Sequence, residues 1–189
     1  MSAPAAGRSA HVRPATEGDI DAVAAIYATE VREGTATFDL EPPPRAKWQQ
    51  MLASAHPGDH FVVAEEDGVV LGYAYSTAYR TRGAYTHTRE VSVYLDPAAT
   101  GRGLGRLLYD DLLARLAAGG THTALACITL PNPASEGLHR ACGFEPVGVM
   151  REVGLKHDRW IDVAWWQRML DAPPPPPTPT PAPTPEAGR

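Results

Sequence analysis

The stretch YLDPAATGRGLGRLLYDDLL, residues 94–113, joins a strand-like run to a helix-like run through one proline and three glycines. Gly101, Gly103 and Gly105 stand where the helix begins, although glycine inside a helix costs roughly 1 kcal/mol relative to alanine. Closely spaced glycines let the free N–H groups of a helix start approach an anion, because no Cβ intervenes and the helix dipole attracts negative charge. The stretch therefore predicts a strand, an anion-binding turn and an amphipathic helix.

The segments on either side of this stretch alternate between strand and helix patterns. Apolar residues at alternate positions or in β-rich runs indicate strands, and apolar residues every three to four positions indicate helices. Strands are expected at 11–14, on both sides of a hairpin turn at Asp67-Gly68, at 87–97, at 123–130, and in two or three runs between 145 and 170. Helices are expected at 16–33, from Arg45 onward, at 104–118 and at 134–142. This order predicts an α/β fold with a mixed sheet covered by helices.

Composition and charge restrict the class of protein. With 189 residues, 43% of them hydrophobic, the chain fits one domain with tails. No apolar run approaches the roughly 18 residues that a membrane span needs. A formal charge of −5 with scattered Lys and Arg argues against nucleic-acid binding. The first residues lack the apolar core of a secretory signal, so a cytoplasmic location is expected.

The ends of the chain differ in composition from the middle. Residues 1–9 are expected to form a flexible leader, residues 10–171 the folded domain, and the proline-rich residues 172–189 a disordered or polyproline-like tail. Cys127 and Cys142 have no metal-ligand spacing, so free thiols and no metal site are expected.

Two nucleotide-binding motifs compete for the glycines, and both fit poorly. The dinucleotide fingerprint requires a third glycine or alanine that GRGLGRLL does not supply, and the phosphate loop requires a Gly-Lys-Ser/Thr that does not follow. An anion-binding turn therefore remains, with a glycine-rich turn that binds nothing as the alternative.

Several segments together resemble a known family. A strand, the loop TGRGLG, an amphipathic helix, a further strand and the segment LPNPASEGLHRACGF are similar to the GNAT superfamily of N-acetyltransferases. The segments RPATEGDIDAVAAIY, GTATFDLEP, YRTRGAYTHTREVSVYLDP and GLKHDRWIDVAWWQ resemble one branch, the phosphinothricin N-acetyltransferases and related amino-acid acetyltransferases. The match spans nearly the whole folded unit. It departs from the superfamily at Thr100, where Gln or Arg is usual.

The resemblance implies a single domain with a mixed, mostly antiparallel sheet of about seven strands and about four flanking helices. Its fourth and fifth strands splay apart and receive acetyl-CoA as cosubstrate, with no metal. The cofactor site implied in this way consists of Val93, Tyr94, Leu95, Gly101, Arg102, Gly103, Leu104, Gly105, Arg106 and Asn132. A homodimer is also implied.

Two residues are candidates for the chemistry of acetyl transfer. An α-amino group has a pKa near 8, so a base must remove a proton, and Glu90 matches the family's catalytic glutamate. His139 matches a position near the sulfur, where an imidazole could protonate the thiolate or relay the proton of the amine. The N–H of Val93 could polarise the acetyl carbonyl. Without the resemblance, Glu90 could be a surface carboxylate and His139 a structural residue.

The acceptor site is expected between the segments TATF and YRTRGAY. Arg82 and Tyr85 match family positions associated with the substrate, and Phe38 could wall the pocket. Arginine suits a carboxylate or phosphinate because its planar fork makes paired hydrogen bonds. Arg80 is interpreted as a solvated loop residue, and Trp160, Trp165 and Trp166 as core or dimer surface.

The main functional hypothesis is transfer of acetyl from acetyl-CoA to the α-amino group of a small amino acid. Phosphinothricin and methionine sulfoximine- or sulfone-like compounds are the expected acceptors, which would give detoxification and herbicide resistance. Two alternatives stay open: the same fold acting on a polyamine, an aminoglycoside or a protein N-terminus, and a non-catalytic CoA-binding sensor.

Overall fold

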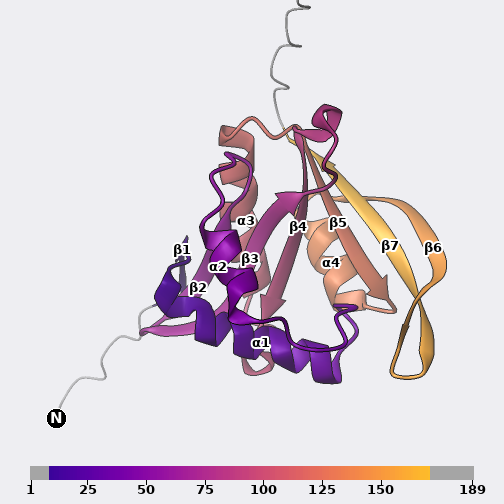
Figure 1. Cartoon of the computed structure of the whole chain (residues 1–189), viewed down its shortest axis with the longest axis horizontal. Coiled ribbons are helices and arrows are strands. Elements are labelled where there is room, and N and C mark those ends of the chain that lie inside the picture. The colour runs from indigo at the N-terminus through magenta and orange to yellow at the C-terminus, as the bar shows by residue number, and fades with distance from the viewer. Residues whose placement is uncertain (1–8, 171–189) are drawn as a thin grey trace, which may run out of the picture.

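The computed structural model describes residues 9–170, whose centre is a twisted seven-stranded sheet (Figure 1). The strands are β1 (His11–Pro14), β2 (Phe61–Glu66), β3 (Val69–Ala78), β4 (Thr88–Leu95), β5 (Thr123–Leu130), β6 (Glu145–Lys156) and β7 (Arg159–Met169). The helices are α1 (Ile20–Glu33), α2 (Arg45–Leu52), α3 (Leu104–Ala118) and α4 (Pro133–Ala141), with short 3₁₀ turns η1 (Glu17–Asp19), η2 (Gly83–Tyr85) and η3 (Pro97–Ala99). The expected order of strands and helices is confirmed.

The sheet is mixed because one pair of strands is parallel. Its strand order is β1-β2-β3-β4-β5-β7-β6, and every neighbouring pair except β4 and β5 is antiparallel. The hairpin predicted between β2 and β3 turns at Asp67 and Gly68, which have φ angles of 50° and 82°. Two successive residues with positive φ match the twist of the flanking strands.

The parallel pair β4 and β5 is joined only at one end. Pairing runs from Thr88 opposite Thr123 to Glu90 opposite Leu125 and then stops. The remaining residues of β4 stay paired with β3 on their other side, as far as Leu95 opposite Gly72. The two central strands therefore splay apart, as expected, and the backbone of β4 beyond Glu90 has one edge that no neighbouring strand covers.

Two hydrophobic cores lie on opposite faces of the sheet. α3 and α4 cover one face, where Val91, Val93 and Leu95 pack with the leucines of α3. α1 and α2 cover the other face, where Trp48 packs with Phe61, Tyr73 and Tyr94. The alternation predicted along β4 is confirmed, because its valines face α3 whereas Tyr94 faces α1. Glu90 and Ser92 share the face of Tyr94 since successive side chains of a strand alternate.

The start of α1 is fixed by a local polar cluster. The backbone N–H of Thr16 donates to the Asp19 carboxylate at 2.7 Å, which is one half of the predicted capping box. Arg13 adds two hydrogen bonds to the same carboxylate, at 2.7 and 2.8 Å. These contacts outweigh the cost of burial and lower the pKa of Asp19 to about 2.

The ends of the chain were assigned to a leader and a tail, and both lie outside the described residues apart from Ser9. Of the helices in the described part, none is long and apolar enough to cross a membrane. Cys127 and Cys142 are both free thiols, as the sequence predicts, and Cys142 is buried in the core under α3.

Candidate functional site

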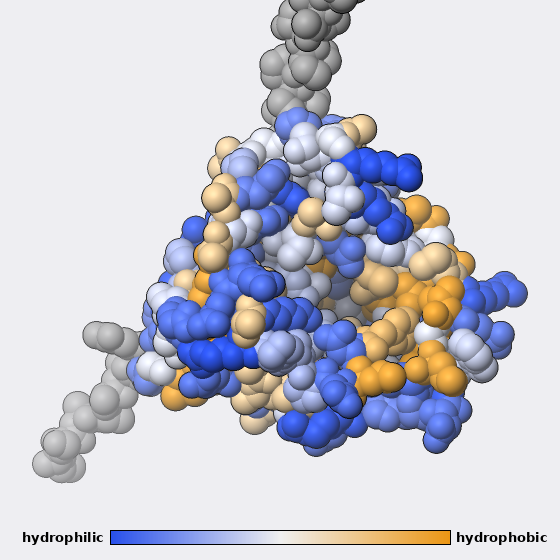
Figure 2. Space-filling view, in the orientation of Figure 1, coloured by the Kyte–Doolittle hydropathy of each residue, from blue (hydrophilic) through white to orange (hydrophobic). Residues whose placement is uncertain are grey.

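A narrow slot opens where β4 and β5 part. Its walls come from both strands, from α3 and α4, and from the segment after α1: Ala36, Val91, Val93, Tyr94, Tyr109, Cys127, Ile128, Thr129, Asn132, Ser135 and His139. Figure 2 shows the surface hollowed in the middle of this view, over the region of β4 and β5. The slot is therefore reached from the α1 and α2 face and ends against α3 and α4.

Glu90 stands at the mouth of this slot. It is the last residue of β4 that pairs with β5, and its other cross-strand neighbour is Thr77. Partial burial raises the pKa of Glu90, and the positive charge of Arg80 opposes that rise. The position combines partial desolvation with access from the open face, which are the properties of a general base.

His139 lies on the opposite side of the slot, only 3% exposed. Its Nδ1 is 2.7 Å from the backbone oxygen of Ser135, one turn earlier in α4. Its Nε2 is 2.9 Å from the hydroxyl of Tyr109 on α3. Burial lowers the pKa of His139, so the neutral imidazole is favoured.

The glycine turn precedes α3 as expected. Gly101 and Gly103 have φ angles of 74° and 78°, and a Cβ added at either would meet no atom within 4 Å. The first carbonyl contact of the helix is the N–H of Leu107 to the oxygen of Gly103 at 3.1 Å. Earlier N–H groups of α3 have no partner within the helix and remain available to an anion.

The third glycine differs from the other two. A Cβ added to Gly105 would lie 2.9 Å from a methyl carbon of Leu138 on α4. Gly105 therefore also allows α3 and α4 to approach each other closely, a role that no local pattern predicts. Leu104 is buried in the core, so only its backbone can reach a ligand.

The two arginines of the turn carry acidic partners. Arg102 makes two contacts of 2.8 Å with Glu66, and Arg106 binds Asp110 at 2.8 and 2.9 Å. Both pairs are solvent-exposed, so either guanidinium can exchange partners at small energetic cost. The Asn132 side chain caps α4 by accepting from the N–H of Ser135 at 3.0 Å.

Among the described residues, the slot offers polar groups without partners, which a hydrogen-bonding ligand could use. Val93, Tyr94 and Leu95 lie on the part of β4 that β5 no longer pairs with, which leaves strand-like donors and acceptors on that edge. In the described part of the chain, the buried hydroxyl of Thr129 in the slot wall has no hydrogen-bond partner. Buried polar groups normally have partners, so both observations suit a hydrogen-bonding ligand in the slot.

The residues expected to form the acceptor site lie on two separate segments. Arg82 and Tyr85 belong to the connection that leads into β4, where Tyr85 packs edge-on against Tyr79 and Tyr79 against Trp165. Phe38 belongs to the 34–44 segment near the other end of β4, where the hydroxyl of Tyr94 donates to the oxygen of Ala36 at 3.4 Å. The structure thus brings Arg82 and Tyr85 together in the lining of one surface cavity, whereas Phe38 lies on a separate segment.

The 34–44 segment is held by the tip of the β6–β7 hairpin. Lys156, only 3% exposed, donates to the backbone oxygen of Thr37 at 2.7 Å and to that of Glu30 at 3.3 Å. Phe38 packs so closely on Gly154 that a Cβ there would overlap its ring. These contacts fix one wall of the hollow.

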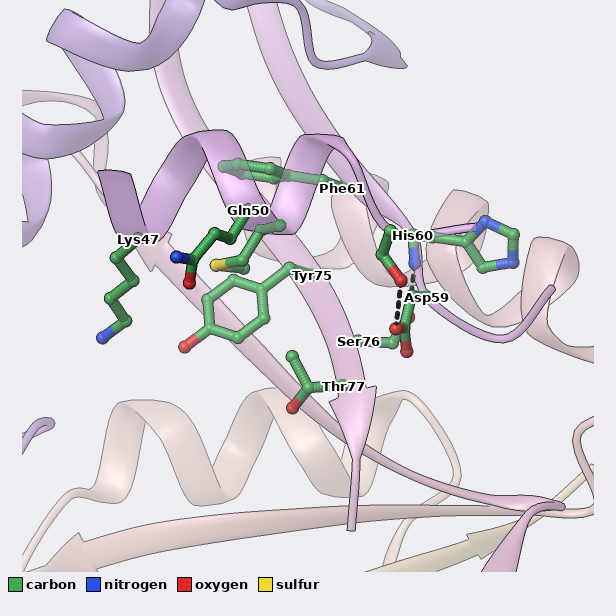
Figure 3. A pocket seen from close by; sticks show the side chains of 10 residues that line it. Lys47, Gln50, Asp59, His60, Phe61, Tyr75, Ser76 and Thr77 are labelled. Carbon is green, nitrogen blue, oxygen red and sulfur yellow. Dashed lines mark hydrogen bonds between the residues drawn. The ribbon is translucent and has the colours of Figure 1, made fainter. Parts of the chain in front are cut away.

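A second cavity of about 390 Å³ lies between α2 and β3 (Figure 3). Lys47, Gln50 and Met51 line it from α2, and Phe61 and Tyr75 form its sheet side. Thr77, the cross-strand neighbour of Glu90, lies on its border, so this cavity adjoins the mouth of the slot.

Sequence reasoning missed several groups at this site. Arg80 is exposed, as its interpretation as a solvated loop residue predicts, but its charge also acts on Glu90, and it lines a surface cavity with Thr81, Arg82 and Tyr85. Tyr109 was hidden within an amphipathic helix pattern, which predicts burial but not a polar partner. Cys127 lines the slot, where partial burial and the negative charge of Glu90 raise the pKa of its thiol to about 11. Alternation along β5 could have identified Cys127 from the sequence, because it lies two residues beyond Leu125 and so points to the same face.

No metal centre is evident among residues 9–170, where no group of three or more His, Cys, Asp and Glu side chains could hold an ion.

Comparisons with known proteins agree with this arrangement. The model of the acetyltransferase (GNAT) family matches residues 23–144. A phosphinothricin N-acetyltransferase of Alcaligenes faecalis is 46% identical over 166 residues, covering 85% of this chain and 83% of that protein. An L-methionine sulfoximine/L-methionine sulfone acetyltransferase of Pseudomonas paraeruginosa is 39% identical over 165 residues, covering 86% and 96%. The crystal structure of a phosphinothricin acetyltransferase from Sinorhizobium meliloti in complex with acetyl-CoA superposes with a TM-score of 0.82 at 40% identity, covering 86% and 89%.

Proposed function

The chain belongs to the GNAT family of acetyltransferases, and we propose on that basis that it moves the acetyl group of acetyl-CoA to the α-amino group of a small amino acid. The observation that carries the proposal is the position of Glu90, a partly buried carboxylate at the mouth of the slot between β4 and β5. Phosphinothricin and methionine sulfoximine or sulfone are the proposed acceptors, because relatives of 46% and 39% identity carry the corresponding names.

The proposed donor site runs from the slot to the start of α3. The backbone of Val93, Tyr94 and Leu95 would hold the pantetheine arm, assisted by Thr129 and Asn132. The N–H groups around Gly101, Gly103, Leu104 and Gly105 would hold the pyrophosphate, with Arg102 and Arg106 adding positive charge. When bound there, acetyl-CoA would supply an activated acetyl thioester for transfer.

The chain's own groups then perform three tasks. The acceptor's ammonium group first loses one proton to water. Glu90 then accepts the second proton as the neutral amine forms the amide bond, and its raised pKa makes it a better base than an exposed carboxylate. The N–H of Val93 would stabilise negative charge on the acetyl oxygen. His139, held between two hydrogen bonds, would help to form the wall of the slot beside the leaving sulfur.

The proposed acceptor site explains the charges at the mouth of the hollow. Arg80 and Arg82 would bind the carboxylate or phosphinate of the acceptor, since a guanidinium makes paired hydrogen bonds with such groups. Tyr85 and Phe38 would bound the site at its two ends. The site as a whole then favours a small anionic amino acid over a polyamine, which the two arginines would repel.

We further propose that the enzyme works as a homodimer in the cytoplasm, where it would detoxify amino-acid analogues and confer resistance to such a herbicide. β6 and the start of β7 expose a set of large apolar side chains: Val147, Val149, Met150, Val153, Leu155 and Trp160. Figure 2 shows an orange area at the right, over the region of β6 and β7. Exposed apolar areas of this kind mark interaction surfaces.

A panel of acceptors tests the proposed substrate class. Release of the CoA thiol is measured with phosphinothricin, methionine sulfone, spermidine, kanamycin and an N-terminal peptide. The proposal expects turnover with the first two only. Preferential turnover of spermidine, kanamycin or the peptide would contradict the acceptor assignment, and binding of acetyl-CoA without turnover of any amine would support a sensor.

A further inference from the structure

A buried hydrogen-bonded chain connects α3 with α4 behind the slot. Tyr109 is fully buried, and its hydroxyl lies 2.9 Å from Nε2 of His139. Nδ1 of the same ring lies 2.7 Å from the backbone oxygen of Ser135. The two rings also meet edge-on, with centroids 5.1 Å apart, so the phenol and the imidazole hold each other in place.

The direction of each hydrogen bond in this chain can be assigned. A backbone carbonyl only accepts, so Nδ1 of His139 must carry the proton that binds the oxygen of Ser135. The neutral ring then has a bare lone pair at Nε2, and Tyr109 must be the donor to it. His139 therefore has no N–H available to the slot in this arrangement, whereas Tyr109 has a hydroxyl proton that can rotate.

The two sides of the slot indicate where the amine would enter and which wall the sulfur would meet. Glu90 shares the face of α1 and α2, so the amine enters from that side. Tyr109 and His139 belong to the side of α3 and α4 and line the same slot. The thioester proposed for this slot would lie between the Glu90 side and the side of α3 and α4, so its sulfur would meet the wall that contains Tyr109.

We propose that Tyr109, and not His139, is the hydrogen-bond donor to the departing sulfur, and that His139 is a positioning residue that holds the phenol proton ready. As the amine nitrogen bonds to the acyl carbon and the C–S bond breaks, the electron pair stays on sulfur and the amine proton goes to Glu90. The O–H of Tyr109 turns from Nε2 to the sulfur. No proton leaves Tyr109, and the thiolate is protonated by water on release.

The relative strength of the two hydrogen bonds favours this rotation. A hydrogen bond to an ionised acceptor is roughly twice as strong as one between neutral groups. The negatively charged sulfur is therefore a better acceptor for the Tyr109 hydroxyl than the lone pair of the imidazole. Burial raises the pKa of Tyr109 well above its usual range, which keeps the phenol protonated and thus a donor throughout the working pH range.

The experiment measures the ionisation of CoA itself bound to the enzyme. The ultraviolet absorbance of the thiolate is followed against pH as the difference between the CoA complex and the desulfo-CoA complex, which cancels the protein's own thiols and phenols. In the wild type, the pKa of the bound thiol should lie below that of free CoA. In Tyr109→Phe it should be higher than in the wild type by about 1 to 2, with kcat down roughly 10- to 100-fold and the affinity for acetyl-CoA retained.

Tyr73→Phe is the matched control. Tyr73 is also fully buried, and within residues 9–170 its hydroxyl has no hydrogen-bond partner. This variant should leave both the thiol pKa and kcat at wild-type values. A similar loss in Tyr73→Phe would overturn the assignment to Tyr109, because any buried phenol would then have the same effect.

Variants of His139 separate the two candidate donors. His139→Gln keeps an acceptor for the Tyr109 hydroxyl and should retain most of the low thiol pKa, whereas His139→Leu removes that acceptor and should lose more of kcat. The proposal is overturned if the bound thiol has the pKa of free CoA in the wild type, a result that needs no variant to fold. It is also overturned if Tyr109→Phe is silent and His139→Gln raises the thiol pKa.

Discussion

At the residue scale, the pKa of Glu90 depends on its burial and on one nearby charge. Burial pushes its pKa upward, and Arg80 is the charge that limits the rise. A carboxylate whose pKa is raised in this way is a better base than an exposed one. The two residues therefore act as a pair, although sequence reasoning assigned a function to only one of them.

Replacing Arg80 should move the acidic limb of the pH profile. Glu90 accepts a proton only when it is ionised, so kcat/KM falls as the pH drops through its pKa. Since Arg80 lowers that pKa, Arg80→Gln should raise it and shift the acidic limb to higher pH, with a higher KM for an anionic acceptor. The profile of kcat/KM against pH is the measurement. Arg45→Gln, which breaks exposed ion pairs with Glu17 and Asp21, is the control, and an equal shift there would reject the pairing of Arg80 with Glu90.

The face of Glu90 could be predicted from the sequence, but its neighbours could not. Alternation along a strand places Glu90 opposite the valines of β4, and the structure agrees. The contact between Tyr109 and His139 joins residues 30 positions apart on two helices, and no local pattern encodes it. For the same reason, the resemblance assigned a role to His139 while its partner on α3 went unnoticed.

At the element scale, the start of α3 combines backbone freedom with open space. Gly103 has a φ angle of 78° and nothing within 4 Å of the position of a Cβ. The order of elements was readable from periodicity and turn residues. The early end of the β4–β5 pairing was implied only by the resemblance, because strand patterns do not report how far two strands stay together.

Gly103→Ala should weaken binding of acetyl-CoA beyond its effect on stability. A left-handed conformation costs a non-glycine residue roughly 1 to 2 kcal/mol, and the methyl group would also stand where an anion approaches the helix start. Gly120→Ala is matched, since Gly120 has a φ angle of 79° and equally open surroundings at the far end of α3. Calorimetric Kd and thermal unfolding are compared. Equal Kd values in the two variants would mean that the turn does not bind the cosubstrate.

At the scale of the whole molecule, one edge of the sheet exposes large apolar side chains. β6 lies at the edge of the sheet and carries Val147, Val149 and Leu155 on its exposed surface. The apolar character of these residues was visible in the sequence. Their exposure was not, because periodicity cannot distinguish a buried strand from one whose apolar face is exposed.

Val149→Lys should convert the proposed dimer to a monomer. A charge at the centre of an apolar interface is costly unless it is paired, so the dimer should dissociate at micromolar concentration. Sedimentation velocity measures the change. Val69→Lys on the β2–β3 hairpin is the control, since Val69 is 57% exposed and Val149 is 55% exposed. A wild type that sediments as a monomer would refute the dimer, as would a Val149→Lys variant that still dimerises.

The catalytic role of Glu90 is tested most directly by the turnover of Glu90→Gln with a reactive amino acid, measured beside its affinity for acetyl-CoA. Glutamine keeps the size of the side chain and removes the proton acceptor. A general base contributes roughly 10²- to 10⁴-fold, so kcat should fall by that factor while the Kd for acetyl-CoA stays within about twofold of the wild type. Wild-type turnover in Glu90→Gln would contradict the account, because the slot would then transfer acetyl groups without the carboxylate at its mouth.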